Sequence, residues 1–156
     1  MRSVVVLVFL LAAGSVAAAP SCFTRPEIDA AHLRVLQQQF NVAALNCQTV
    51  DPGAPTFSER YNRFVTLFSD QLQRNSETLR RHFARDQGGL DRWITRIANN
   101  AGQAVFMKPD FCQVAWDRLD HVITLDGAQM ESYAVETAVA RDFAPACPEK
   151  PAKKGK

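Results

Sequence analysis

The sequence lacks an excess of charge of either sign. It carries 18 basic and 16 acidic side chains, which give a formal net charge of +2. Four lysines lie between residues 150 and 156, so the remainder of the chain is slightly acidic. A protein that coats nucleic acid needs a clear basic excess on its folded part. We therefore expect no nucleic-acid partner.

The sequence also lacks the motifs of common catalytic and cofactor sites. It contains no C-x-x-C pair, no G-x-S-x-G turn and no glycine-rich phosphate loop. No two cysteines or histidines have the spacing of a zinc site. We interpret Gly88-Gly89 as a helix terminator. We therefore expect no catalytic residue, cofactor or metal ion, and the sequence does not favour an enzyme.

Long apolar runs are absent except at the start of the chain. Arg2 precedes an apolar stretch from Val4 to Ala13, and small residues follow up to Pro20. This order is typical of a secretory signal peptide. An uncleaved membrane anchor is the alternative, but a spanning helix needs about 20 apolar residues. We expect a signal peptide over residues 1–18, cleavage after Ala18, no transmembrane span after cleavage, and a periplasmic or secreted protein.

Four cysteines are present, and all follow the predicted cleavage site. An even set of cysteines in an exported chain predicts two disulfides. Three pairings are open, and the helix order given below favours Cys47 with Cys112 and Cys22 with Cys147. We expect the first of these bonds to matter more to the core, because terminal segments often fray.

Apolar residues recur at helical spacing along most of the chain, and no segment alternates long enough to predict a strand. Thr24-Arg25-Pro26-Glu27 has the pattern of a capping box. The helices we expect cover about 24–46, 56–87, 90–106, 110–123 and 129–142. Any bend in the second is expected at Asn75 and Ser76. The predicted class is all-α, a single domain over residues 19–147 with four to five antiparallel helices stapled by disulfides, followed by a disordered tail over 148–156.

The densest positive region follows the middle of the chain. A patch of this kind suits an acidic envelope component or an acidic protein, whereas a solvated face around a helix end is the plainer interpretation. The patch comprises Arg74, Arg80, Arg81, His82, Arg85, Arg92 and Arg96.

Two other groups of residues invite a functional interpretation. Asp117, Asp120 and His121 combine carboxylates with an imidazole, but on a helix His121 points about 100° away from Asp120. We therefore favour ordinary salt bridges. Aromatic residues at helical spacing could line a ligand cavity, although they more often form a core. They are Tyr61, Phe64, Phe68, Phe83, Trp93 and Trp116.

Three stretches of the sequence carry a family resemblance. They are residues 36–47, the run Tyr61-Asn62-Arg63-Phe64-Val65, and residues 90–99 leading to Phe111-Cys112. The chain resembles a group of small exported proteobacterial four-cysteine helical proteins without an assigned activity. The resemblance covers roughly residues 22–125 and implies export to a periplasm. It assigns no functional residue.

Taken together, these features favour a non-enzymatic protein that binds another protein or a component of the cell envelope. The alternative is a carrier of a small apolar ligand in the core of the bundle. A packed core would argue against the carrier, and a cleft with converging titratable groups would favour an enzyme.

Overall fold

The computed structural model describes residues 22–48 and 53–148. The predicted signal peptide lies outside these residues, as does the predicted tail except for Pro148. No helix of the described part is long and apolar enough to cross a membrane.

The described residues form an all-helical fold with six helices and an isolated bridge between Phe23 and Ala146, and without strands. This confirms the predicted class, while the count exceeds the four to five helices expected. The helices are α1 (Arg25–Asn46), α2 (Phe57–Leu67), α3 (Ser69–His82), α4 (Gly89–Met107), α5 (Phe111–Val122) and α6 (Gly127–Thr137).

The extra helix arises because the predicted second helix is divided at Phe68. There the backbone leaves helical geometry, with φ −112° and ψ 24°. Phe64 and Phe68 are both buried, with ring centroids 5.4 Å apart, so the kink keeps both rings in the core while the chain changes direction. The expected bend at Asn75 and Ser76 does not occur. Both residues lie within α3, where their side chains donate hydrogen bonds to backbone carbonyls.

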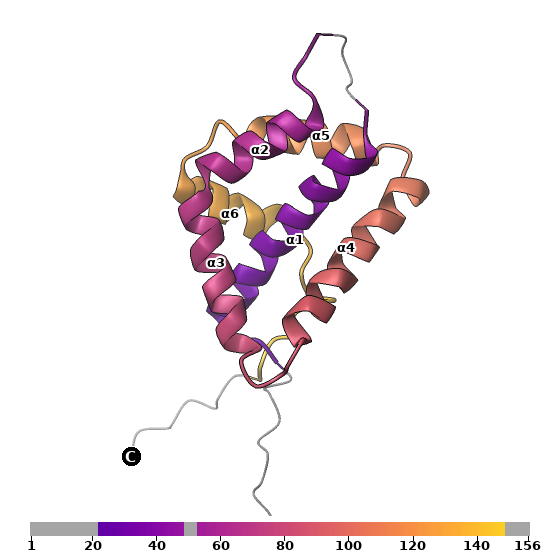
Figure 1. Cartoon of the computed structure of the whole chain (residues 1–156). Coiled ribbons are helices and arrows are strands. Elements are labelled where there is room, and N and C mark those ends of the chain that lie inside the picture. The colour runs from indigo at the N-terminus through magenta and orange to yellow at the C-terminus, as the bar shows by residue number, and fades with distance from the viewer. Residues whose placement is uncertain (1–21, 49–52, 149–156) are drawn as a thin grey trace, which may run out of the picture.

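Helix α1 is the central element and packs against each of the other five helices (Figure 1). Its buried side chains therefore occupy several faces, as Leu33, Val35 and Leu36 illustrate. Helices α2 and α5 lie across the end of the molecule where α1 ends, rather than alongside it (Figure 1). The layout is thus less regular than the antiparallel bundle expected, because the kink at Phe68 turns α2 away from the direction of α3.

The two disulfides lie at opposite ends of the fold. Cys47 after α1 is bonded to Cys112 in α5, and Cys22 is bonded to Cys147, with Cα–Cα distances of 5.6 and 4.7 Å. These are the pairs that the helix order favours. We call the two regions the 47–112 end and the 22–147 end.

The last described segment is a packed part of the core rather than the end of a helix. The predicted fifth helix was expected to reach residue 142, but α6 ends at Thr137. Beyond it, Ala140 and Phe143 are buried, and the Phe143 carbonyl accepts a hydrogen bond of 2.7 Å from the Trp93 indole. Burial of these side chains favours a turn at residues 140–144 beside α4 over continuation of the helix.

Candidate functional site

The residues of the predicted basic patch have different partners in the structure. Arg74 pairs with Glu131 at 3.5 Å, and Arg92 pairs with Asp86 at 2.6 Å. Arg96 donates a hydrogen bond of 3.4 Å to a backbone carbonyl beside α4. The structure places Arg80, Arg81 and Arg85 at an exposed helix end, where cations also suit the helix dipole. The six arginines are exposed, whereas His82 is buried.

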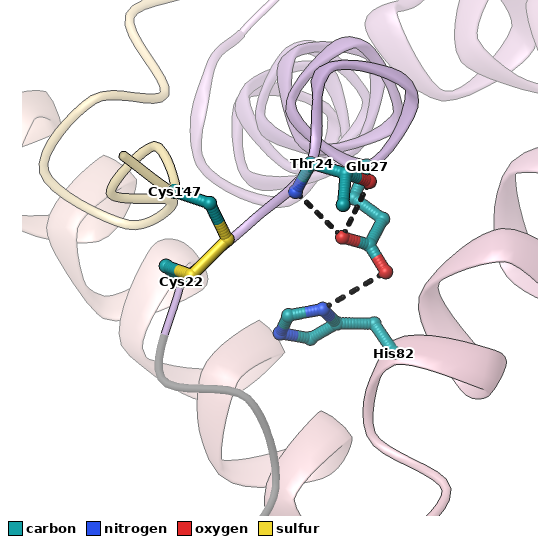
Figure 2. Close-up of a disulfide and its surroundings, with 5 residues drawn as sticks. All are labelled: Cys22, Thr24, Glu27, His82 and Cys147. Atoms are coloured by element: carbon teal, nitrogen blue, oxygen red, sulfur yellow. Dashed lines mark hydrogen bonds and ion pairs between the residues drawn. A yellow bond between two sulfur atoms is a disulfide. The ribbon is translucent and has the colours of Figure 1, made fainter. Parts of the chain in front are cut away.

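His82 is buried and belongs to a polar clamp at the 22–147 end (Figure 2). Its Nδ1 lies 3.1 Å from a carboxylate oxygen of Glu27, and its ring stacks on Phe23 with centroids 3.8 Å apart. The other Glu27 oxygen accepts hydrogen bonds of 2.7 Å from the backbone N–H and the hydroxyl of Thr24. The capping box predicted at Thr24 is confirmed.

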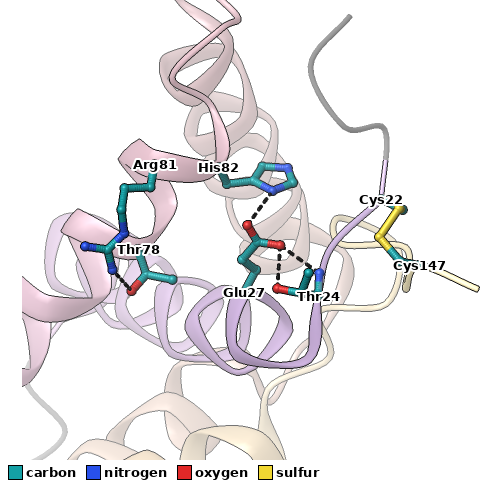
Figure 3. A network of polar contacts seen from close by, with 7 residues as sticks. All are labelled: Cys22, Thr24, Glu27, Thr78, Arg81, His82 and Cys147. Carbon is teal, nitrogen blue, oxygen red and sulfur yellow. Dashed lines mark hydrogen bonds and ion pairs between the residues drawn. A yellow bond between two sulfur atoms is a disulfide. The ribbon is translucent and has the colours of Figure 1, made fainter. Parts of the chain in front are cut away.

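The clamp shows how a helix cap is joined to tertiary structure. Burial raises the pKa of Glu27, but the hydrogen bonds from Thr24 and the contact with His82 outweigh it, so the pKa is lowered overall. Arg81, next to His82 in the chain, turns away from Glu27 and donates to Thr78 at 3.2 Å (Figure 3). Since the His82 side chain is nearly enclosed, its imidazole is not accessible to a substrate, and we interpret the pair as a structural clamp.

The carboxylates and the histidine of α5 do not converge. Asp120 forms an ion pair with Arg60, and Asp117 accepts a hydrogen bond of 2.9 Å from Gln113. His121 lies beside Tyr133, with ring centroids 5.2 Å apart. Within the described residues, no group of three acidic, histidine or cysteine side chains is placed to hold a metal ion.

The candidate cavity residues pack mainly against other side chains. The Phe40 ring lies 5.3 Å from that of Phe64, in an edge-to-face arrangement. Trp116 lies 4.9 Å from Phe57 and carries the Arg60 guanidinium 4.2 Å above its ring. Such contacts stabilise a core beyond simple burial. We therefore interpret these aromatic residues as part of the packed core.

A shallow surface hollow of about 670 Å³ runs along the outward side of α4. Arg92 and Arg96 line its first half, and Asn99, Asn100 and Gln103 continue the row toward the 47–112 end. All five are exposed, and they follow one another at steps of one, three or four residues. Because residues at this spacing share one side of a helix, the row presents hydrogen-bonding groups along one side of α4.

The polar row leads to an exposed apolar pair. Phe106 and Met107 in the last turn of α4 are 86% and 78% exposed. Asn100 also lines a second hollow of about 190 Å³, which includes Ala104 and Phe111 and continues between α1, α4 and α5. Phe106 and Met107 are not among the candidate site residues predicted from the sequence. The available signal was their position on the helix, which is outside the buried stripe formed by Trp93, Ile97 and Ala101.

More apolar surface gathers at the same end of the molecule. Leu45 is 77% exposed and Val114 is also exposed. Each lies two residues from a cysteine of the Cys47–Cys112 bond, so the disulfide brings them to one region. We call the five residues of the polar row, together with Phe106 and Met107, the α4 face.

Comparison with protein-family models, curated proteins and solved structures yields no match.

Proposed function

We propose that this chain is a non-enzymatic binding protein of the cell envelope that docks another protein or an envelope component through the α4 face. The observation that carries the proposal is the continuity of a polar row with an exposed aromatic and methionine pair on one helix. Interfaces typically combine a few such apolar anchors with a surrounding polar rim.

Exposure of Phe106 and Met107 supports this assignment energetically. Burying a phenylalanine or methionine side chain contributes about 1.5–3 kcal/mol. Inside the fold these two side chains contribute little of that energy because they remain in solvent. A partner that covers Phe106 and Met107 would gain this burial free energy on binding. Single exposed apolar residues are ordinary, but two adjacent ones beside further exposed apolar residues form a patch.

The cysteines and the start of the chain support an extracytoplasmic compartment. Two disulfides are typical of proteins that fold in an oxidising environment outside the cytoplasm. The order of residues over 1–20 matches a signal peptide. We therefore propose that the chain acts in the periplasm or after secretion.

The alternative of an apolar-ligand carrier has less support. The larger hollows of the described part are open at the surface rather than enclosed in the core. Phe40, Phe57 and Phe64 are almost fully buried against neighbouring side chains. A ligand in the core would have to displace these contacts.

The test removes the apolar anchors while keeping the fold. The unaltered, disulfide-bonded chain is used to retain its partner from an envelope extract of its source cells. We expect the F106S/M107S double variant to retain at least tenfold less of that partner. The matched control is L67S/V139S, which changes two exposed apolar residues elsewhere. Equal thermal midpoints of the three proteins verify folding. Undiminished retention by F106S/M107S, or equal loss in the control, contradicts the proposal.

A further inference from the structure

A hollow of about 190 Å³ lies where α4 and α5 both pack against α1. We call it the α1–α4–α5 hollow, and it is less open than the hollow along α4. Ala104 of α4 and Phe111 of α5 are half-buried in its wall, and Val114 of α5 is exposed beside them. An apolar cavity of about 150 Å³ admits benzene. The hollow therefore has room for a hydrocarbon group of about six carbons.

A partly buried positive charge without a partner lines the same hollow. Arg118 of α5 is half-buried, and it takes part in none of the ion pairs formed by the described residues. No nitrogen atom of its side chain is buried without a hydrogen-bond partner, so the guanidinium remains accessible to a ligand in the hollow. Partial removal of a charge from water is costly when no opposite charge compensates it. Arg118 therefore favours an anionic ligand.

The remaining charges of the hollow offset one another. Lys108 and Asp110 lie in the connection between α4 and α5, and both are exposed. Solvent and salt screen exposed charges more strongly than partly buried ones. One ammonium and one carboxylate at this edge therefore leave the positive charge of Arg118 uncompensated. Gln39 and Asn100 add side-chain amides, whose N–H groups can donate to an anion.

Helix α5 places the apolar groups and the guanidinium on one side. Phe111, Val114 and Arg118 follow one another at steps of three and four residues, which share one side of a helix. The helix rises by about 10 Å from Phe111 to Arg118, so this side is apolar at its start and cationic further along. The bond between Cys47 and Cys112 joins the end of α1 to the first turn of α5, and it therefore fixes two walls of the hollow.

We propose that the α1–α4–α5 hollow binds a small monocarboxylate with a hydrocarbon group of about four to six carbons. Its carboxylate would accept paired hydrogen bonds from Arg118, and its hydrocarbon part would lie against Ala104 and Phe111. Such a ligand lies at the surface of the fold and displaces no core contact. The inference goes beyond the proposed function, because the hollow shares only Asn100 with the α4 face and takes a small molecule.

The probe is hexanoate, compared with 1-hexanol and hexylammonium as ligands of nearly equal size and with acetate as the carboxylate alone. Binding to the disulfide-bonded chain is measured by calorimetry and by amide chemical shifts. We expect hexanoate to bind at least tenfold more tightly than hexanol or acetate, and hexylammonium to show no saturable binding. Shift changes should concentrate in residues 39–40, 100–104 and 111–118. Absence of saturable hexanoate binding, equal affinity for hexanol or acetate, or shift changes centred elsewhere overturns the proposal.

The variant Arg118→Gln removes the charge but keeps a donor, and should weaken hexanoate binding at least tenfold. The matched control Arg63→Gln makes the same change of net charge at an exposed position of α2 outside the hollow, and should leave affinity within twofold. Asp110 makes no side-chain cap to α5, so Asp110→Asn removes the opposing carboxylate without loss of a cap and should raise affinity at least twofold. This second variant tests the same electrostatic argument if Arg118→Gln fails to fold. Unchanged affinity in folded Arg118→Gln, equal loss in Arg63→Gln, or no gain in Asp110→Asn overturns the proposal.

Discussion

The bond between Cys22 and Cys147 should contribute more to stability than the bond between Cys47 and Cys112, which reverses the expectation from sequence. The two bonds span sequence separations of 125 and 65 residues. In the chain-entropy model these loops correspond to about 5 and about 4 kcal/mol, with a difference of about 0.6 kcal/mol in favour of the longer loop.

The fold removes the reason for ranking the terminal bond lower. Fraying was expected at the ends, but Phe23 is only 5% exposed and packs against the rings of His82, Phe83 and Trp93. Its backbone N–H donates to the Pro145 carbonyl at 2.8 Å. The bond therefore fastens segments that belong to the core, so its entropic contribution should be expressed in global unfolding.

The assay is urea unfolding of two double variants, C22A/C147A and C47A/C112A, each with its other disulfide intact. The denaturant slope is about 1–3 kcal/mol per molar. The urea midpoint of C22A/C147A should therefore be about 0.2–0.6 M lower than that of C47A/C112A. Hydrogen exchange at the Phe23 amide then distinguishes global unfolding from local release of the terminus. A C47A/C112A variant less stable than C22A/C147A by about 1 kcal/mol or more would refute this entropic ranking.

Three further changes should alter stability in stated directions. Gly88 has φ +73° before α4, so Gly88→Ala should cost about 1–2 kcal/mol in the left-handed region, measured by thermal unfolding. Thr56 accepts a hydrogen bond from the Glu59 N–H, so Thr56→Ala should cost about 1 kcal/mol in urea, whereas Thr56→Ser should retain most of the stability. The pKa of Glu27 is lowered in the fold, so its contribution is present above the unfolded pKa and is lost as pH falls through the folded pKa. Glu27→Gln should therefore destabilise the protein at pH 7, and urea unfolding at pH 3 should show a smaller difference from the unaltered chain.

Local chemistry and helix order made part of the fold predictable. The capping box at Thr24 needs only residues three positions apart, and it appears as predicted. The pairing of Cys47 with Cys112 follows from counting helix ends, because α1 ends where α5 begins. Such features depend on near neighbours or on chain direction alone.

Features that depend on distant partners were not predictable. No glycine or proline marks the division between α2 and α3 at Phe68. The division depends on the packing of Phe68 with Phe64, which the sequence pattern does not reveal. The path after Thr137 depends on burial of Phe143 near α4, and no local period indicates this. The hydrogen bond from Asn75 of α3 to the Ala30 carbonyl of α1 requires both helices together, so Asn75 looked only like a helix interruption in the sequence.

The two ends of the described chain lie far from the exposed apolar side chains of Phe106 and Met107. Cys22 and Cys147 are bonded, so an attachment to either end of the described chain departs from the 22–147 end. Helix α4 begins near that end and carries Phe106 and Met107 to the opposite one (Figure 1). Its 19 residues correspond to a rise of about 28 Å. Either end of the described chain can therefore serve as a tether to a surface or a fusion partner while the anchors remain turned outward, and a pull applied across both ends is borne by the disulfide before it reaches the helices.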